Sequence, residues 1–117
     1  MDTMLYLQKL GLTRYQSGVL SALLSRQNST ALEITNLTGV PYTKIYSVLD
    51  ALSYMGFITA DIERPMRFRA TDIETIVDSL VKRHSESLSR MKRVGEEVKS
   101  AYMALADEFH AEMGKAI

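Results

Sequence analysis

Three arginines lie close together near the middle of the sequence. Arg64, Arg67 and Arg69 fall within six residues that contain no acidic side chain. Guanidinium groups form paired hydrogen bonds with phosphates and carboxylates, so this spacing indicates a surface that binds anions. The alternative interpretation is a charged strand edge that only prevents aggregation.

A second basic stretch covers residues 82–93, where five Lys and Arg side chains accompany Glu86 as the only acid. The acids gather further along, and residues 96–112 hold five Asp and Glu against Lys99. A run of this kind is usually a solvated helix face. A role in flanking a bound anion is the alternative.

The sequence lacks the side chains from which an enzyme is usually built. It contains no cysteine, and His84 and His110 are 26 positions apart (110 − 84) on one expected helix, so they cannot meet within a chain. Neither a Gly-rich phosphate loop nor a Cys/His metal spacing is present. We therefore expect no catalytic residue, no metal and no cofactor. His84 is interpreted as a tolerated polar residue rather than a metal ligand or pH sensor.

Composition places the chain among ordinary folded proteins of one domain's length. The 117 residues are 46% hydrophobic and 24% charged, and 14 basic residues balance 14 acidic ones. These values exclude a wholly disordered chain and a disulfide scaffold. No apolar run approaches the roughly 20 residues of a membrane span. The default expectation is a cytoplasmic protein whose zero net charge hides the uneven distribution described above.

Capping signals divide the first 71 residues into helices. Thr13, Thr30 and Thr71 each precede Gln or Glu by three positions, which is the pattern of a capping box. Helices are expected over residues 2–9, 14–25, 31–37 and 41–55. Between the last two lies a tight turn at residues 38–40, and the final helix begins with Pro and is followed by Gly56.

The fourth expected helix has two different faces. Its inner face holds apolar residues at helical spacing, namely Ile45, Val48, Leu49 and Leu52. Its outer, N-terminal face carries no acid and offers the candidate contact residues Tyr42, Thr43, Lys44, Tyr46 and Ser47. Packing of the two tyrosines against the protein, and simple solvation of the others, are the alternatives.

The hydrophobic period then changes to that of strands. Residues 57–62 and 66–70 are expected to form two strands joined by a turn at 63–65. Alternation along the second strand places Met66, Phe68 and Ala70 inward, with Arg67 and Arg69 outward.

From residue 72 to about 113 the sequence predicts one helix, roughly 60 Å long at 1.5 Å per residue. An apolar stripe runs from Ile73 to Met113 in eleven steps over 40 residues, a mean of 3.64 residues per step. This period lies nearer a hendecad than a heptad and predicts a nearly straight or slightly right-handed pairing. The expected homodimer interface comprises Leu80, Leu88, Met91, Val98, Tyr102, Leu105 and Phe109. Parallel and antiparallel pairing both remain open.

A helix, a short turn, a second helix and an Arg-rich hairpin follow one another in the order of a winged helix-turn-helix. The expected fold is therefore mostly α (α+β): a winged helix-turn-helix head over residues 1–71 and a long C-terminal dimerisation helix over residues 72–117.

Four segments resemble the TrmB family of archaeal winged helix-turn-helix transcription regulators. They are Leu10-Gly-Leu-Thr13-x-Tyr15, Gly39-Val-Pro41-x-x-Lys44-Ile-Tyr46-x-Val-Leu49, Gly56-Phe-Ile58 and Arg64-Pro65-x-x-Phe68-Arg-Ala70. The resemblance implies binding of double-stranded DNA as a dimer, with a recognition helix over 41–55 and a wing over 61–69. Larger family members carry a sugar-sensing domain. We expect this chain to be a short form without it, and with no small-molecule effector.

The leading hypothesis is a dimeric, sequence-specific regulator. Its recognition helix would enter the major groove, and its Arg-rich wing would lie on the backbone or in the minor groove. Two alternatives stay open: an architectural DNA-binding protein of low specificity, and a winged-helix module that docks other proteins.

Overall fold

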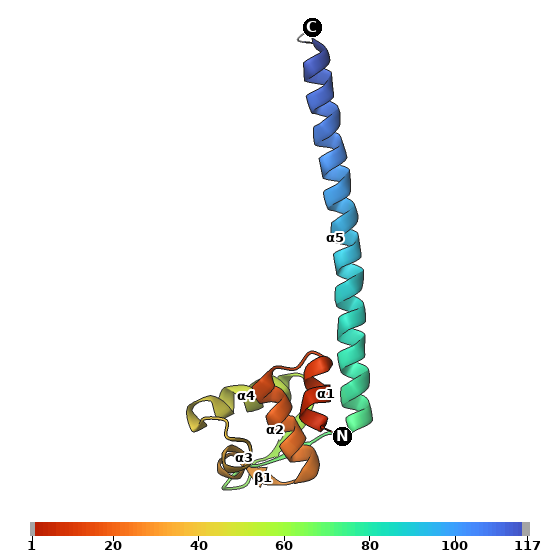
Figure 1. The fold of residues 1–117 in the computed structure, drawn as a ribbon. Helices are drawn as coiled ribbons and strands as arrows, with labels where there is room; N and C mark the ends of the chain where they lie inside the picture. The colour runs from red at the N-terminus through yellow and green to blue at the C-terminus, as the bar shows by residue number, and fades with distance from the viewer. Residues whose placement is uncertain (1, 116–117) are drawn as a thin grey trace. The chain divides into compact units, whose positions relative to one another are not determined.

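A computed structural model describes residues 2–115, which form five helices and three short strands (Figure 1). The elements are α1 (Thr3–Lys9), α2 (Arg14–Ser25), β1 (Ser29–Thr30), α3 (Ala31–Thr38), α4 (Tyr42–Tyr54), β2 (Ile58–Asp61), β3 (Arg67–Ala70) and α5 (Ile73–Lys115). The expected fold class is confirmed, and each expected helix and strand lies within a few residues of its predicted bounds.

The predicted cap of α2 is a complete capping box. The backbone N–H of Gln16 donates to the Thr13 hydroxyl at 3.2 Å, and the Thr13 N–H donates to the Gln16 side chain at 3.0 Å. At α3 only half of the predicted box forms: the Thr30 hydroxyl accepts from the Glu33 N–H at 3.2 Å, while the Glu33 carboxylate lies 3.7 Å from Arg67. Both caps satisfy N–H groups that have no partner within the helix.

The third predicted capping box is wrong. Asp72, not Thr71, accepts from the first turn of α5, at 3.2 Å from the Thr75 N–H. The Thr71 hydroxyl instead donates to the carbonyls of Gly56 and Phe57, at 3.2 and 3.1 Å. Thr71 therefore ties the start of α5 to the end of α4, and the helix begins one residue later.

The turn between α3 and α4 depends on glycine. Gly39 ends α3 with φ of 76° in the left-handed region, which a residue with a Cβ adopts only with strain. Pro41 then stands at the N-cap of α4 with no side-chain hydrogen bond to the helix. This geometry produces the three-residue turn that the sequence predicted.

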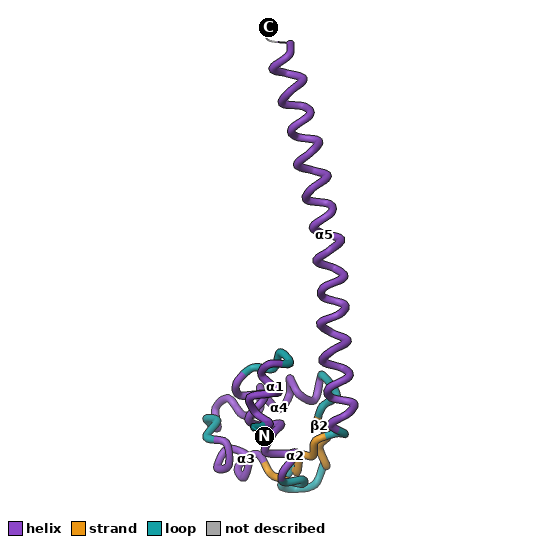
Figure 2. The backbone as a smooth tube through the Cα atoms, turned by 45° about the vertical axis from the view of Figure 1, so that its right-hand side comes forward, coloured by secondary structure: helices purple, strands orange, loops and turns teal. Residues whose placement is uncertain are grey.

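The strands, orange in Figure 2, form one antiparallel sheet, and their order is β1-β3-β2. Ala60 of β2 and Ser29 of β1 both pair with Phe68 of β3. β1 could not be predicted from the sequence, because two residues carry no period-2 pattern. β1 adds a third strand to the wing hairpin, on the side of β3 opposite β2.

The core confirms the predicted inner face of α4, since Ile45, Val48, Leu49 and Leu52 are all buried. The other buried apolar side chains come from the remaining helices, from β2 and β3, and from the loops between them: Leu7, Leu12, Val19, Leu20, Leu23, Ala31, Ile34, Val40, Phe57, Ile58, Phe68, Ile76 and Leu80. Phe68 points inward as predicted. Met66 does not, because 45% of its surface is exposed.

Two apolar residues of α5 pack into the core of the head instead of lying on an exposed apolar stripe. Ile76 and Leu80 are 0% and 4% exposed within the core cluster. The first compact unit consequently extends to Val81, and the second begins at Lys82, later than the expected boundary at residue 72. Leu80 is thus removed from the predicted dimer interface, because its side chain is already covered within its own chain.

Candidate nucleic-acid interface

The outer face of α4 is exposed over its N-terminal half. Tyr42 and Tyr46 are 53% and 48% exposed, and Thr43, Lys44 and Ser47 are also exposed. The buried face opposite docks the helix firmly on the head. All five predicted residues therefore lie together on one accessible surface without an acidic neighbour before Asp50.

The two tyrosines of this face touch each other. Their ring centres are 5.9 Å apart and the rings are nearly perpendicular, at 89°. A hydrogen bond with Tyr42, and then the charge on Tyr42 when it ionises, raise the pKa of Tyr46 above its ordinary value of 10.0. Tyr46 is accordingly neutral at physiological pH and keeps an O–H group.

Lys44 lies beside Tyr15 of α2, a residue that was not among the predicted contact residues. Its ammonium nitrogen is 5.7 Å from the centre of the Tyr15 ring. A cation over an aromatic face is attracted to the ring, and at an exposed site this contributes about 0.5–1 kcal/mol. Tyr15 thereby fixes Lys44 next to the N-terminal end of α4.

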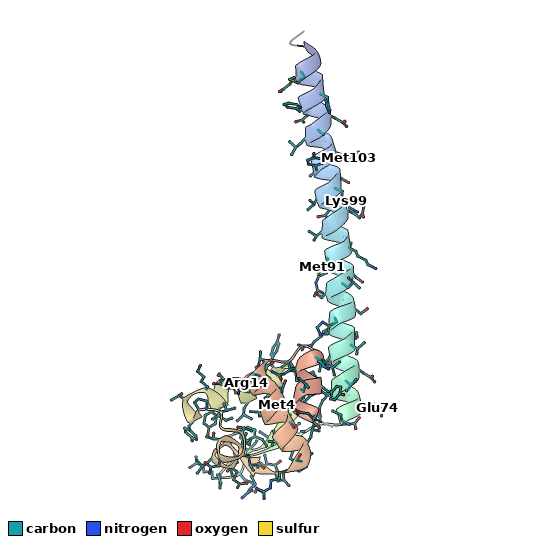
Figure 3. The ribbon with its side chains drawn as sticks, in the orientation of Figure 1. Met4, Arg14, Glu74, Met91, Lys99 and Met103 are labelled. Carbon is teal, nitrogen blue, oxygen red and sulfur yellow. The ribbon has the colours of Figure 1, made fainter. Side chains whose placement is uncertain are left out.

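A groove of about 540 Å³ lies between α2 and the turn that leads into α4. Arg14 and Tyr15 line it from one side, and Thr38, Gly39 and Val40 line it from the other. Arg14, labelled in Figure 3, is exposed and makes no ion pair among the residues that the structure describes. Arg14 is thus a candidate contact residue. The one feature of the sequence that points to Arg14 is its position directly after Thr13, the N-cap of α2.

The hydroxyl of Ser47 has a partner within its own helix. It donates to the carbonyl oxygen of Lys44 at 2.8 Å. The oxygen lone pairs remain available, so Ser47 in this rotamer can accept a hydrogen bond from a ligand but does not offer a donor.

The three wing arginines differ in how they are held. Arg69 pairs with Asp61 across the hairpin at 3.3 Å. Arg67 donates to the carbonyl of Asn28 at 2.8 Å and lies 3.7 Å from a carboxylate oxygen of Glu33. Arg64, in the turn, is exposed and has no ion pair within residues 2–115.

These contacts do not join the wing to α4. The partners of Arg67 and Arg69 lie on α3, on β2 and in the loop before β1. The structure therefore gathers the α4 residues into one surface with Arg14 and Tyr15, and it leaves the arginines on a separate hairpin. Exposed ion pairs of this kind contribute little, about 0–1 kcal/mol, so a phosphate can compete with them.

The second unit, which begins at Lys82, exposes large apolar side chains along α5. Met91 and Met103, both labelled in Figure 3, are 68% and 63% exposed. The predicted interface residues Leu88, Val98, Tyr102, Leu105 and Phe109 are exposed as well. Single exposed apolar residues are common, but a continuous series marks an interaction site.

The sequence model described as "Sugar-specific transcriptional regulator TrmB" matches residues 7–74, more than half of the chain. The chain belongs to the TrmB family. Within the curated relatives, it is 30% identical over 106 residues to the HTH-type sugar sensing transcriptional regulator TrmBL1 of Pyrococcus furiosus. That match covers 91% of this chain and 29% of TrmBL1, so the chain spans under a third of the relative's length.

Solved structures support the same fold for this TrmB-family chain. The structure of TrmBL2, described as an archaeal chromatin protein with a novel mode of DNA binding, matches with a TM-score of 0.79 at 19% identity. The match covers 88% of this chain and 41% of TrmBL2. The MarR-family regulator SPO1453 of Silicibacter pomeroyi matches with a TM-score of 0.54 at 20% identity, over 74% and 64% of the two chains.

The family relatives are transcription regulators, not enzymes, which agrees with the absence of a catalytic arrangement in the sequence. Over the described part of the chain, no helix is both long and apolar enough to cross a membrane. Within residues 2–115, no three His, Cys, Asp or Glu side chains lie where they could share a metal ion.

Proposed function

We propose that this chain is a dimeric, sequence-specific DNA-binding transcription regulator in which α4 enters the major groove. One observation carries the proposal: α4 is anchored by a fully buried face and exposes a polar, acid-free surface from Tyr42 to Ser47. A helix fits the major groove, where side chains can contact base edges that differ between all four base pairs. Membership of the TrmB regulator family supports this interpretation.

The cations around α4 suit the phosphate backbone on either side of the groove. Lys44 and Arg14 flank the N-terminal end of the helix, and Arg64 projects from the wing. Phosphate contacts position a protein on DNA but do not distinguish sequences. We therefore assign these three residues to affinity, together with Arg67 and Arg69 once DNA displaces their exposed acidic partners.

Sequence recognition would depend on weaker contacts. None of the five outer residues of α4 is Arg, Asn or Gln, the side chains that pair bidentately with guanine or adenine. Thr43 and Ser47 make single hydrogen bonds or methyl contacts, each at the lower end of about 1–3 kcal/mol per base pair. Specificity then requires two half-sites, and we expect a two-fold symmetric site preferred by a factor on the order of 10²–10³.

A dimer would supply the two half-sites. The apolar series from Leu88 to Phe109 is exposed in the single chain, and a second copy of the chain is the partner that this pattern fits best. The dimer should bury well over about 1,200 Å², the lower limit for stable interfaces.

Selection from a library of random duplexes tests this function. The wild-type protein should enrich a symmetric motif, and the double variant Thr43→Ala/Ser47→Ala should lose most of the preference while still binding DNA. Ser53→Ala, which removes an exposed hydroxyl from the C-terminal end of the same helix, serves as the control and should keep the motif. Selection without any enriched motif would refute sequence-specific regulation.

Salt dependence tests the assignment of Arg14. Arg14→Ala should weaken binding to all sequences equally and lower the magnitude of the salt slope by about 1. Lys9→Ala removes the same charge from the end of α1, where Lys9 lies over the Tyr6 ring, and should leave the slope unchanged. Equal slopes for Arg14→Ala and the wild type would exclude Arg14 from the interface.

An architectural DNA-binding role is the second candidate. The observation in its favour is the lack of bidentate side chains on α4, and TrmBL2, whose fold is similar, is described as a chromatin protein. Strong DNA binding with no enriched motif would favour this role. A failure to bind duplex DNA at low salt would instead favour a protein-docking module.

A further inference from the structure

We propose that two copies of α5 pair antiparallel, with the two-fold axis near Val98. The inference rests on the dimer of the proposed function and specifies its geometry, which the hydrophobic period leaves open. The surface concerned is the series Leu88, Met91, Gly95, Val98, Tyr102, Leu105 and Phe109, whose large apolar side chains are exposed.

The charges along this part of α5 are segregated by sequence. Residues 82–93 carry five Lys and Arg and one acid, whereas residues 96–112 carry five Asp and Glu and one lysine. Parallel pairing would place like charges side by side along both halves. Antiparallel pairing places the basic half of each helix beside the acidic half of its partner, which is the complementary arrangement.

The apolar series also has the symmetry that antiparallel pairing needs. Its positions are 88, 91, 95, 98, 102, 105 and 109, and they are nearly symmetric about 98. Leu88 then faces Phe109 of the second copy, and Met91 faces Leu105. Val98 faces its own counterpart on the axis.

The small size of Gly95 suits this antiparallel register. It faces Tyr102 of the second copy, so the largest side chain of the series meets the smallest residue. A Cβ built on Gly95 would have no heavy atom within 4 Å in the single chain, so the packing of its own chain does not require glycine there. Close approach of a partner helix gives the position a reason to be small.

One charged pair outside the apolar series distinguishes the two orientations. Arg90 and Glu108 are 18 residues apart, which is five full turns, so both lie on the same side of the helix. In the antiparallel register each Arg90 lies beside Glu108 of the second copy. In a parallel pair in register, Arg90 would instead lie beside Lys92 of the second copy.

Disulfide cross-linking provides the direct test, because the chain contains no cysteine of its own. Val98→Cys should cross-link to itself, Leu88→Cys alone should not, and a mixture of Leu88→Cys with Phe109→Cys chains should form the mixed dimer. Positions 88 and 109 are about 32 Å apart along one helix, far beyond the Cα separation of about 7 Å that a disulfide tolerates. Self-cross-linking of Leu88→Cys would overturn the antiparallel arrangement.

A charge reversal gives a second test that does not depend on oxidation. Arg90→Glu should weaken the dimer on the order of tenfold in sedimentation, and Arg90→Glu/Glu108→Arg should restore it, because two such pairs form per dimer. A tighter dimer for Arg90→Glu alone would support parallel pairing. A wild-type chain that sediments as a folded monomer at micromolar concentration would refute the proposed dimer itself. The other outcomes would refute only its antiparallel arrangement.

Discussion

The ammonium group of Lys44 lies over the ring of Tyr15, with 5.7 Å between the nitrogen and the ring centre. This contact links the first turn of α2 to the exposed face of α4. The two helices are not consecutive in the chain, and the contact limits the freedom of a cation at the edge of the proposed groove contact.

Loss of the Tyr15 ring should weaken DNA binding. Tyr15→Leu is expected to lower affinity about twofold to fivefold, because the Lys44 side chain loses a contact of about 0.5–1 kcal/mol that orders it. Tyr15→Phe keeps the ring and should bind like the wild type in fluorescence anisotropy. Tyr6→Leu removes the ring beneath Lys9 in the same way, at 5.1 Å, and serves as the matched control. A similar loss of affinity for both leucine variants would indicate an indirect effect on folding.

The wing arginines should separate into two classes. Arg64→Ala is expected to reduce DNA affinity and the salt slope without changing the thermal midpoint, since Arg64 makes no ion pair within the described chain. Arg67→Ala should reduce both affinity and stability, the latter by about 0.5–1 kcal/mol, because it loses the Asn28 carbonyl and Glu33. Thermal unfolding of the two variants without DNA checks the difference. Unchanged binding for both would reduce the wing to a solvated hairpin.

The tyrosine pair of α4 should be visible in an alkaline titration. The pKa of Tyr46 in the folded chain lies above its unfolded value, mainly because of its hydrogen bond with Tyr42. The contact therefore stabilises the fold fully below about pH 10, and this contribution is lost as the pH rises through the raised pKa. The ultraviolet absorbance of ionised phenol should show a late phase that belongs to Tyr46, and Tyr42→Phe should move the pKa of Tyr46 toward 10.0. A persistent late phase in Tyr42→Phe would assign the shift to another cause.

Leu80 and Leu88 should behave differently although both lie in the predicted stripe. Leu80 is 4% exposed in the head, so Leu80→Ala should destabilise the head by about 2–5 kcal/mol. Leu88→Asp combined with Leu105→Asp should dissociate the dimer while the head core, which lies before Lys82, stays folded. Sedimentation and near-ultraviolet circular dichroism together distinguish the two effects. A dimeric Leu88→Asp/Leu105→Asp protein would contradict the role of α5.

Much of this molecule is determined by local sequence. The period of the apolar residues and the Thr13 capping box set the positions of α2 and α4, because helical side chains repeat every 3.6 residues wherever the helix lies. The polar face of α4 follows from the same geometry, since burying Ile45 and Leu49 leaves Thr43 and Ser47 outside. These features need no knowledge of distant contacts, and the structure agrees with them.

Tertiary structure decided the features in which several local choices were equally good. Thr71 and Asp72 can both cap a helix, and contacts of Thr71 with Gly56 and Phe57 leave Asp72 as the cap of α5. Leu80 fits the α5 stripe, but the head buries it.

The same holds for contacts between segments far apart in sequence. Neither the pairing of Ser29 with Phe68 nor the position of Arg14 beside the turn into α4 follows from sequence spacing, because each depends on how separate elements pack. Local spacing therefore predicted the elements and the chemistry of their faces, and packing selected which side chains remain accessible to a partner.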